Sequence, residues 1–226
     1  FRKLDNNIMW KPLVNEGEFV EKGNVILEFR GQYRALLTGE RTALNFAQRM
    51  SGISTMAHEY AKVLERTSCR ILDTRKTLPA HRMLDKYAVK VGGGENHRIG
   101  LFDMVMIKDN HIQVAGGIKN AIEAVRKNLS NDILIEVETT NIDEVKEALE
   151  NKANIIMLDN MNTQQMKDAV EFINKRAITE ASGSMSIERL KETAMAGVDY
   201  ISVGALTHSV KAFDISQKIK NQAKNE

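Results

Sequence analysis

Short apolar runs alternate with amphipathic stretches through residues 70–221. The apolar runs predict β-strands in six places, at residues 70–73, 104–107, 133–138, 155–158, 177–181 and 200–203. Between and after them, apolar residues recur at helical spacing, which predicts helices near residues 79–88, 117–128, 142–150, 163–175, 186–196 and 209–221. This alternation is typical of a parallel sheet whose strands are joined by helical crossovers.

The number of predicted strands bears on whether this sheet closes into a barrel. An eight-stranded α/β barrel usually needs about 250 residues, whereas the whole chain has 226. Six strands are predicted, and residues 87–91 are the candidate for a seventh. We therefore predict an α/β fold with an incomplete, six- or seven-stranded parallel α/β barrel, or an open sheet, beginning at residue 69.

Residues 1–68 follow a different pattern. Residues 8–38 place apolar positions around turns at Gly17 and Gly23, which predicts a small β layer. A long helix is predicted to start within residues 38–42, with Glu40 and Arg41 ahead of its first turn and free to project past the helix end. The chain begins at Phe1 and its first residues resemble the middle of a domain, so we expect that an N-terminal portion is missing.

Composition narrows the classes of partner. Lys plus Arg number 32 and Asp plus Glu number 30, a net charge of +2, which argues against a general nucleic-acid-binding surface. No apolar run approaches the ~20 residues that span a bilayer. The chain has a single cysteine, Cys69, so it cannot form an internal disulfide, which fits a reducing cytoplasm. We predict that Cys69 is a buried structural thiol.

Charged residues gather where the predicted strands end, and the loops after such ends are where α/β enzymes bind ligands. The cations there are Arg75, Lys76, Arg98 and Lys108, with Thr74 and His97 beside them. The acids are Glu138, which shares a strand face with Glu136, and Asp159. Four cations within residues 71–111 predict an anionic ligand. The last two strand ends carry Ser182-Gly183-Ser184 and Val203-Gly204-Ala205. Both precede predicted helices, which predicts a phosphate site.

The acids have three possible roles: they can bind Mg²⁺ through oxygen ligands, bind sugar hydroxyls, or stabilise a cationic transition state. The sequence argues against other chemistries. Five scattered histidines and one cysteine offer no zinc-site spacing. There is no G-x-S-x-G motif for a serine hydrolase. The run Gly92-Gly93-Gly94 lacks the order of a dinucleotide-binding fingerprint.

Eight motifs carry a resemblance that covers almost the whole chain. In chain order they read ERTALN, DTRKT, GGGENHRIGL, IKDNH, EVE, MLDN, EASGS and SVGALTHS. In order and spacing the chain resembles the quinolinate phosphoribosyltransferase family, which is also called carboxylating nicotinate-nucleotide pyrophosphorylase. The resemblance implies a small N-terminal α/β sandwich domain, here partial, at residues 1–68. It also implies a catalytic barrel at residues 69–207 and a C-terminal helix at 208–226 that packs on the first domain.

The same resemblance implies the reaction and its requirements. Quinolinate and 5-phosphoribosyl 1-pyrophosphate would give nicotinate mononucleotide, pyrophosphate and carbon dioxide, with Mg²⁺ as cofactor. The protein would be a cytoplasmic homodimer or dimer-based oligomer in NAD biosynthesis, with no nucleic-acid or membrane partner.

The resemblance also implies residue roles. Arg75, Arg98 and Lys108, with His97 and Thr74 nearby, would hold the carboxylates of quinolinate. Lys76 would lie between quinolinate and the pyrophosphate, and Arg41 would come from the other subunit. Glu138 and Asp159 would face the ribose hydroxyls and the metal, directly or through water. Lys76, Glu138 and Asp159 would be catalytic. Residues 182–184 and 203–205 would bind the 5′-phosphate. Ser184 departs from the family, which usually has a second glycine there.

Two other functions stay open. One is a related phosphoribosyltransferase-fold protein that acts on a different small acid, such as the molybdenum-operon homologue. The cations Arg75, Arg98 and Lys108 favour a dicarboxylate instead. The other is a non-catalytic protein that binds a phosphate ligand, and the presence of both Glu138 and Asp159 argues against it.

Overall fold

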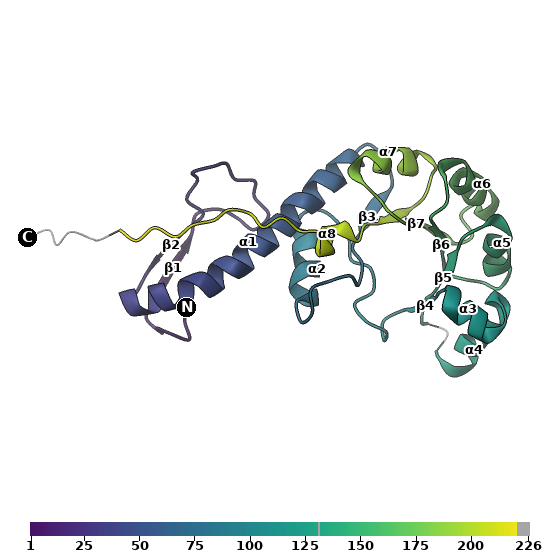
Figure 1. Cartoon of the computed structure of the whole chain (residues 1–226), viewed down its shortest axis with the longest axis horizontal. Coiled ribbons are helices and arrows are strands. Elements are labelled where there is room, and N and C mark those ends of the chain that lie inside the picture. The colour runs from purple at the N-terminus through teal and green to yellow at the C-terminus, as the bar shows by residue number, and fades with distance from the viewer. Residues whose placement is uncertain (131, 221–226) are drawn as a thin grey trace, which may run out of the picture.

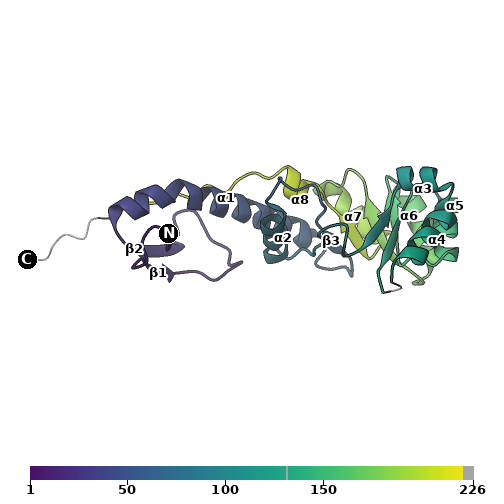
Figure 2. The ribbon, with the colours of Figure 1, turned by 90° about the horizontal axis from the view of Figure 1, so that it is seen from below.

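The computed structural model describes residues 1–130 and 132–220. The molecule is elongated, with a small hairpin at one end, a strand-and-helix barrel at the other, and one long helix that joins them (Figures 1 and 2). The boundary predicted between residues 68 and 69 falls in the connection from this helix to the barrel, and it stays a prediction.

The N-terminal end consists of a hairpin and the first half of the long helix. Strands β1 (Met9–Pro12) and β2 (Leu27–Arg30) pair antiparallel, and Trp10 stacks on Phe29 with ring centroids 6.0 Å apart. Helix α1 (Tyr33–Val63) starts earlier than predicted. The expectation that Glu40 and Arg41 precede its first turn was therefore wrong: Arg41 lies inside the helix, roughly two turns after its start.

The barrel contains six parallel strands in the order β3-β8-β7-β6-β5-β4. They are β3 (Arg70–Leu72), β4 (Val105–Ile107), β5 (Ile135–Thr139), β6 (Ile155–Asp159), β7 (Ile178–Ser182) and β8 (Tyr200–Ser202). This confirms the predicted incomplete barrel. Strands β3 and β4 are the two edges of the sheet, so the barrel has an open seam between them. The core includes Ile135, Val137, Ile156, Leu158 and Ile201, which are fully buried.

Helices α3 (Asp109–Ala115), α4 (Ile118–Asn128), α5 (Ile142–Glu150), α6 (Thr163–Ile173) and α7 (Ile187–Met195) lie on the outer side of the barrel (Figure 1). Helices α2 (Arg82–Val91) and α8 (Ala205–His208) pack against α1 instead. Helices α3 and α8 were not predicted, because seven and four residues are too short to show an apolar period.

Within the described residues no seventh strand fills the seam between β3 and β4. The strand proposed at residues 87–91 was wrong, because these residues end helix α2, whose buried face includes Ala88 and Val89. After the helix, Glu95 forms a single parallel bridge with Leu72. Buried Lys86 donates to Asp73 and, at 2.7 Å, to the carbonyl of His97. This network ties β3 to α2 and to the loop at residues 92–104 that follows α2, here named the seam loop.

The C-terminal segment differs from the prediction. A helix was expected over residues 208–226, but residues 209–220 form no helix, and residues 221–226 lie outside the described part. Instead the segment runs back along α1 (Figure 1). The amide of Phe213 donates to the Gln48 carbonyl, and the Gln48 side chain donates to the Ile215 carbonyl, both at 2.8 Å. Hydrogen bonds to α1 thus take the place of the bonds that a helix would have formed within the segment. A short helix would have been only marginally stable by itself.

Two smaller expectations concern Cys69 and membrane spans. Cys69 is buried as predicted, and burial raises the pKa of its thiol to about 12, so it is not a ready nucleophile. Among the described helices, none is both long enough and apolar enough to cross a bilayer.

Candidate active site

The C-terminal ends of the six barrel strands point to one face, and the predicted site residues lie there or in the seam beside it. Contacts show that neighbouring ends come together. Lys108, after β4, contacts Glu138 of β5, and Asp159 of β6 is paired in register with Ser182 of β7. Arg41 is the predicted site residue that does not lie in this region.

Two arginines border the seam, and their positive charges act on one another. Arg98 is buried, with 8% of its surface exposed, and its Nη1 donates to the Met104 carbonyl at 3.1 Å. Burial and the nearby charge of Arg75 both lower the pKa of Arg98. Within residues 1–130 and 132–220, neither guanidinium forms an ion pair with a carboxylate. A buried cation without an acidic partner is costly, so this pair suits an anionic ligand with the planar geometry that arginine recognises.

The loop after β3 is held in place at several points. The Thr74 hydroxyl accepts the amide of Lys76 at 3.1 Å, and the Thr207 hydroxyl donates to the Lys76 carbonyl at 2.9 Å. The Lys76 side chain lies against Gly204, where an added Cβ would be 3.2 Å from both Lys76 Cδ and His208 Nε2. His208 therefore borders the loop at residues 203–205. Sequence reasoning missed it, although it stands within the quoted motif SVGALTHS.

A buried ion pair supports this loop from behind. Asp85 of α2 is fully buried and accepts from Arg49 Nε at 2.9 Å and Nη2 at 2.7 Å. The same Nη2 donates to the Thr207 carbonyl at 3.1 Å, and Asp85 also accepts the amide of Leu78. The pair joins α1, α2 and α8 to the β3 loop. No sequence signal marked it, because a charge on an amphipathic helix normally faces water.

The two predicted metal-facing acids sit at neighbouring strand ends. Glu138 Oε2 is 2.7 Å from Lys108 Nζ, and Asp159 Oδ2 accepts from the Asn160 side chain at 2.6 Å. Carboxylate oxygens suit Mg²⁺, which commonly binds one or two carboxylates together with substrate phosphates. In the described part of the chain these acids are not grouped with a third ligand. They fit a magnesium ion that arrives with a phosphorylated substrate, but not a closed protein cage.

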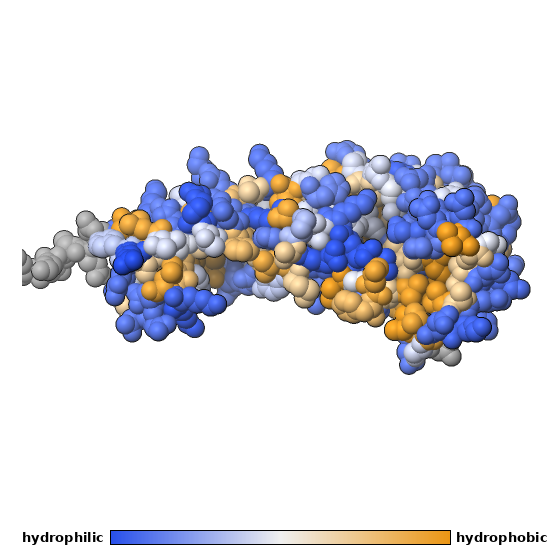
Figure 3. Space-filling view, turned by 60° about the horizontal axis from the view of Figure 1, so that its bottom comes forward, coloured by the Kyte–Doolittle hydropathy of each residue, from blue (hydrophilic) through white to orange (hydrophobic). Residues whose placement is uncertain are grey.

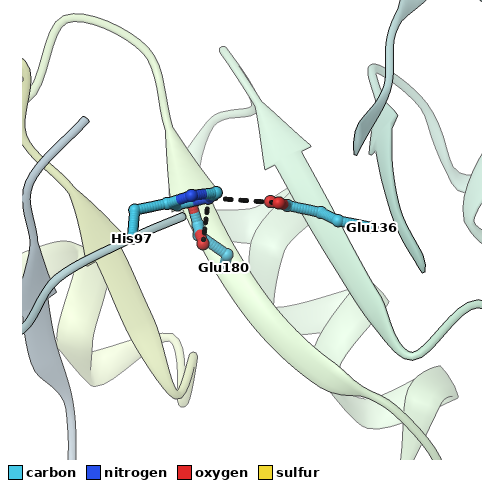
Figure 4. A group of neighbouring side chains, drawn as sticks. All are labelled: His97, Glu136 and Glu180. Atoms are coloured by element: carbon cyan, nitrogen blue, oxygen red, sulfur yellow. Dashed lines mark ion pairs between the residues drawn. The ribbon is translucent and has the colours of Figure 1, made fainter. Parts of the chain in front are cut away.

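His97 lies deeper than the cations around it. Its Nε2 is 3.1 Å from Glu136 Oε2 and 3.5 Å from Glu180 Oε2 (Figure 4). Burial lowers the pKa of His97, but hydrogen bonding to Glu136 and Glu180, with their negative charges, outweighs burial and raises it to about 9. Nδ1, however, accepts a hydrogen bond from the Arg98 amide at 2.7 Å. A doubly protonated ring carries hydrogen on both nitrogens, so it could not accept this bond. We favour the ring protonated on Nε2 alone, because this backbone contact fixes the position of Nδ1. Neither Glu136 nor Glu180 was predicted as a partner of His97.

The loop after β7 has a strained and crowded backbone. Gly183 has φ +97°, and an added Cβ there would lie 2.1 Å from Asn160 Oδ1. Ser184 and Asn160 also have positive φ, 40° and 55°. Glycine, which the resemblance would place at residue 184, adopts this conformation without steric cost. Strain of this kind is common where backbone amides approach a ligand.

We expect Gly183→Ala to destabilise the protein more than Gly23→Ala. Gly23 has a similar φ of +93° but nothing within 4 Å of an added Cβ, so alanine there adds only about 1–2 kcal/mol of backbone strain. At Gly183 the clash with Asn160 adds about 1–3 kcal/mol. Denaturant unfolding of both variants measures the difference, and equal losses would show that the loop relaxes around the new methyl group.

Arg41 is exposed and lies in the first half of α1. This half of the helix extends away from the barrel (Figure 1). Arg49, which donates to the Thr207 carbonyl behind the β3 loop, lies on the same helix about 12 Å nearer to the barrel. In the described structure, Arg41 has no hydrogen-bond or ion-pair partner. The chain therefore does not bring Arg41 to its own strand ends.

Comparisons with known proteins agree with this arrangement. Residues 53–218 match the family model described as the quinolinate phosphoribosyl transferase C-terminal domain, and residues 1–51 match that of the N-terminal domain. The structure is similar to the crystal structure of NadC from Streptococcus pyogenes. The TM-score is 0.93, the identity is 38%, and the match covers 96% of this chain and 77% of that one.

Curated relatives agree as well. The rice (Oryza sativa subsp. japonica) chloroplastic nicotinate-nucleotide pyrophosphorylase [carboxylating] is 48% identical, and the match covers 98% of this chain and 64% of the relative. The Bacillus subtilis protein named probable nicotinate-nucleotide pyrophosphorylase [carboxylating] is 43% identical, with 97% and 76% covered. This chain thus spans about two thirds to three quarters of the length of these relatives. It belongs to the quinolinate phosphoribosyltransferase family.

Proposed function

We propose that this chain carries out the reaction of its family in NAD biosynthesis. It would transfer the phosphoribosyl group of 5-phosphoribosyl 1-pyrophosphate to quinolinate with loss of carbon dioxide. The products would be nicotinate mononucleotide and pyrophosphate. The observation that carries the proposal is the pair of arginines, Arg75 and buried Arg98, at one end of the row of strand ends, neither of which forms an ion pair within the described residues.

The charge of the site supports a dicarboxylate as the acid substrate. Arg75 and Arg98 offer planar donors that match carboxylates. Lys108 stands across the seam, with its ammonium on Glu138 and 43% of its side chain exposed, so it can turn to a second carboxylate. A monoacid bound to the arginines would leave Lys108 paired with Glu138 alone.

The ribosyl donor would bind at the other end of the row of strand ends. Backbone amides of residues 182–184 and 203–205 would bind the 5′-phosphate, with His208 beside them. Lys76, which lies against Gly204, would reach the pyrophosphate. Glu138 and Asp159 would hydrogen-bond the ribose hydroxyls and hold Mg²⁺. When bound, Mg²⁺ would neutralise charge on the leaving pyrophosphate.

Bond changes follow from this placement. The ring nitrogen of quinolinate attacks C1 of ribose as the bond to pyrophosphate breaks. The ribose carbon becomes oxocarbenium-like, and the carboxylates of Glu138 and Asp159 stabilise its positive charge. The ring is then a cationic pyridinium. As carbon dioxide leaves, ring carbon C2 keeps the electron pair of the broken carbon–carbon bond, the adjacent positive nitrogen stabilises that pair, and a proton from water then replaces the lost carboxylate.

A dimer with shared sites completes the proposal. Arg41 would extend from one subunit to the quinolinate site of the other, which accounts for its exposed position away from its own barrel. Apolar side chains gather on the barrel half of the face in Figure 3. Leu101 and Phe102 of the seam loop are 73% and 77% exposed. Exposed apolar surface of this kind commonly marks a protein interface.

We expect Lys108→Ala to weaken the binding of quinolinate more than that of the ribosyl donor. Loss of a charged hydrogen bond should cost about 1.5–3 kcal/mol of quinolinate binding free energy. Calorimetric titration of each substrate into the wild-type and variant proteins measures the binding free energies of quinolinate and of the ribosyl donor. Weaker donor binding with unchanged quinolinate binding would place Lys108 in the donor site instead.

A substrate panel distinguishes the proposal from its alternatives. Pyrophosphate release with quinolinate, but not with nicotinate or other small acids, supports this reaction. Release with another acid would favour a related transferase, and no release with any acid would favour a binding protein. The rice relative is named chloroplastic, so a cytoplasmic location for this chain stays a proposal, which cell fractionation tests.

A further inference from the structure

Strands β3 and β8 are neighbours, and the loops after them carry the two halves of the proposed donor site. Their backbone pairing ends at Leu72, whose carbonyl accepts the Val203 amide at 2.9 Å. Beyond this bond, within the described residues, no backbone hydrogen bond joins residues 73–80 to residues 204–208. Side chains must therefore hold Lys76 in place beside the loop after β8.

Thr207 joins the two loops through its hydroxyl. The residue is 1% exposed, and its Oγ1 lies 2.9 Å from the Lys76 carbonyl and 3.3 Å from the Gly204 carbonyl. A hydroxyl has one hydrogen, so it donates fully to only one of these oxygens. The shorter distance favours Lys76. Thr207 thus gives up the bond that a helical threonine commonly makes within its own turn, and bonds the neighbouring loop instead.

The backbone of Thr207 is held in turn from α1 and α2, which lie beside α8 (Figures 1 and 2). Arg49 Nη2 donates to the Thr207 carbonyl at 3.1 Å. Asp85 is fully buried and accepts from the same arginine at 2.7 and 2.9 Å. Asp85 also accepts the amide of Leu78, two residues after Lys76, at 3.3 Å. These contacts form a closed ring that begins and ends on the loop after β3.

The ring fixes geometry more than it adds stability. A buried ion pair often contributes little net free energy compared with apolar side chains of the same volume, because both charges lose their hydration. The planar fork of arginine, however, holds its partners at set angles. The ribosyl donor carries a phosphate at one end and a pyrophosphate at the other. A site that binds both groups must keep its cation and its phosphate loop at a fixed separation.

We infer that Thr207, Arg49 and Asp85 are positioning residues for the ribosyl donor. They hold the loop after β3 against residues 203–205. Lys76 then meets the pyrophosphate while the backbone amides of the other loop meet the 5′-phosphate. The inference rests on the proposed function, because it assigns Lys76 to the pyrophosphate.

Arg75 shares the loop with Lys76 but is held by a different side chain. Arg82 Nη2 donates to the Arg75 carbonyl at 3.4 Å, and Arg82 Nη1 donates to the Ile99 carbonyl of the seam loop at 3.0 Å. This second arginine ties Arg75 to the part of the site proposed for quinolinate. Loosening the Thr207 ring should therefore affect the ribosyl donor more than the acid.

A pair of threonine variants isolates the hydroxyl. Thr207→Val keeps the shape of the side chain and removes the donor to Lys76, whereas Thr207→Ser keeps the donor. We expect Thr207→Val to raise the KM for the ribosyl donor about tenfold at saturating quinolinate, with an unchanged KM for quinolinate. Thr207→Ser should stay close to the unaltered protein. Arg49→Lys keeps the charge but loses the planar fork, so it should raise the donor KM in the same way.

The control variant is Arg126→Lys. Arg126 donates to the Ile133 carbonyl at 3.0 Å and to the Asn154 side chain at 2.9 Å, before β5 and β6 at the other end of the barrel. It should leave both KM values unchanged. If it raises the donor KM as much as Arg49→Lys does, the effect is a general loss of order and the inference is wrong. An unchanged donor KM in Thr207→Val, or an equal rise in both KM values, would also overturn it.

Binding of inorganic pyrophosphate in the presence of Mg²⁺ separates this inference from the proposed function, because it needs no turnover. In calorimetric titrations, Thr207→Val should bind pyrophosphate more weakly than the unaltered protein, and Thr207→Ser should bind it equally well. Equal affinity of Thr207→Val and the unaltered protein would contradict the inference. Failure of the unaltered protein to turn over quinolinate would instead count against the proposed function, and the titrations would still test the ring.

Discussion

Lys86→Met is expected to lower the free energy of unfolding by about 3–5 kcal/mol, the usual cost of leaving one member of a buried ion pair without its partner. The Lys86 side chain is 2% exposed and that of Asp73 is fully buried. Lys86 also donates to the His97 carbonyl, so the change frees the seam loop that carries His97 and Arg98. Denaturant unfolding measures the stability, and quinolinate binding should weaken as well.

The matched control is the double variant Lys86→Met/Asp73→Asn. It removes both charges, so no buried carboxylate is left unpaired. The new asparagine side chain would still offer an oxygen to the His97 amide, which donates to Asp73 at 3.0 Å in the unaltered protein. We expect this double variant to recover at least half of the lost stability. A double variant less stable than Lys86→Met alone would show that the ion pair is not what stabilises the seam.

Mixing two inactive variants should restore activity if subunits share their sites. Arg41→Ala and Lys76→Ala proteins should each be nearly inactive. After subunit exchange, a hybrid dimer has one site with Lys76 from one chain and Arg41 from the other, so that site is intact. Activity should therefore rise in proportion to the hybrid population, up to one working site per hybrid dimer.

The control for this experiment is a mixture of Lys76→Ala and Lys108→Ala proteins. The structure places both residues at the strand ends of one barrel, so no exchange of subunits can assemble an intact site from them. Native mass spectrometry should confirm that hybrids form. Confirmed hybrids of the Arg41 and Lys76 variants without recovered activity would show that Arg41 serves its own chain or no site.

The sequence was sufficient to predict the barrel and the face that carries the site. Its strands are short apolar runs, and the ends of parallel strands must meet at one edge, so the sequence alone groups Lys108, Glu138 and Asp159. The seam could not be predicted. Lys86 and Asp85 stand on an amphipathic helix, where charge normally indicates a solvent-exposed face, and only the tertiary structure buries them.

Two other features depended on contacts distant in sequence. Residues 209–220 pack in extended form because α1 provides hydrogen-bond partners for Phe213 and Ile215. No local pattern shows that these partners will be present. The partners of His97 also come from distant strands, and Glu180 falls inside the strand predicted at residues 177–181. A side chain in the middle of a strand does not reveal which loop residue will reach it.

The central claim is that this chain joins quinolinate to a phosphoribosyl group and removes one carboxylate. The most direct measurement is the release of labelled carbon dioxide from quinolinate labelled in the carboxylate next to the ring nitrogen, with 5-phosphoribosyl 1-pyrophosphate and Mg²⁺ present. The account predicts carbon dioxide, pyrophosphate and nicotinate mononucleotide in equal amounts, and no release without the ribosyl donor. Pyrophosphate release without carbon dioxide, or no release of either from folded protein, would contradict it.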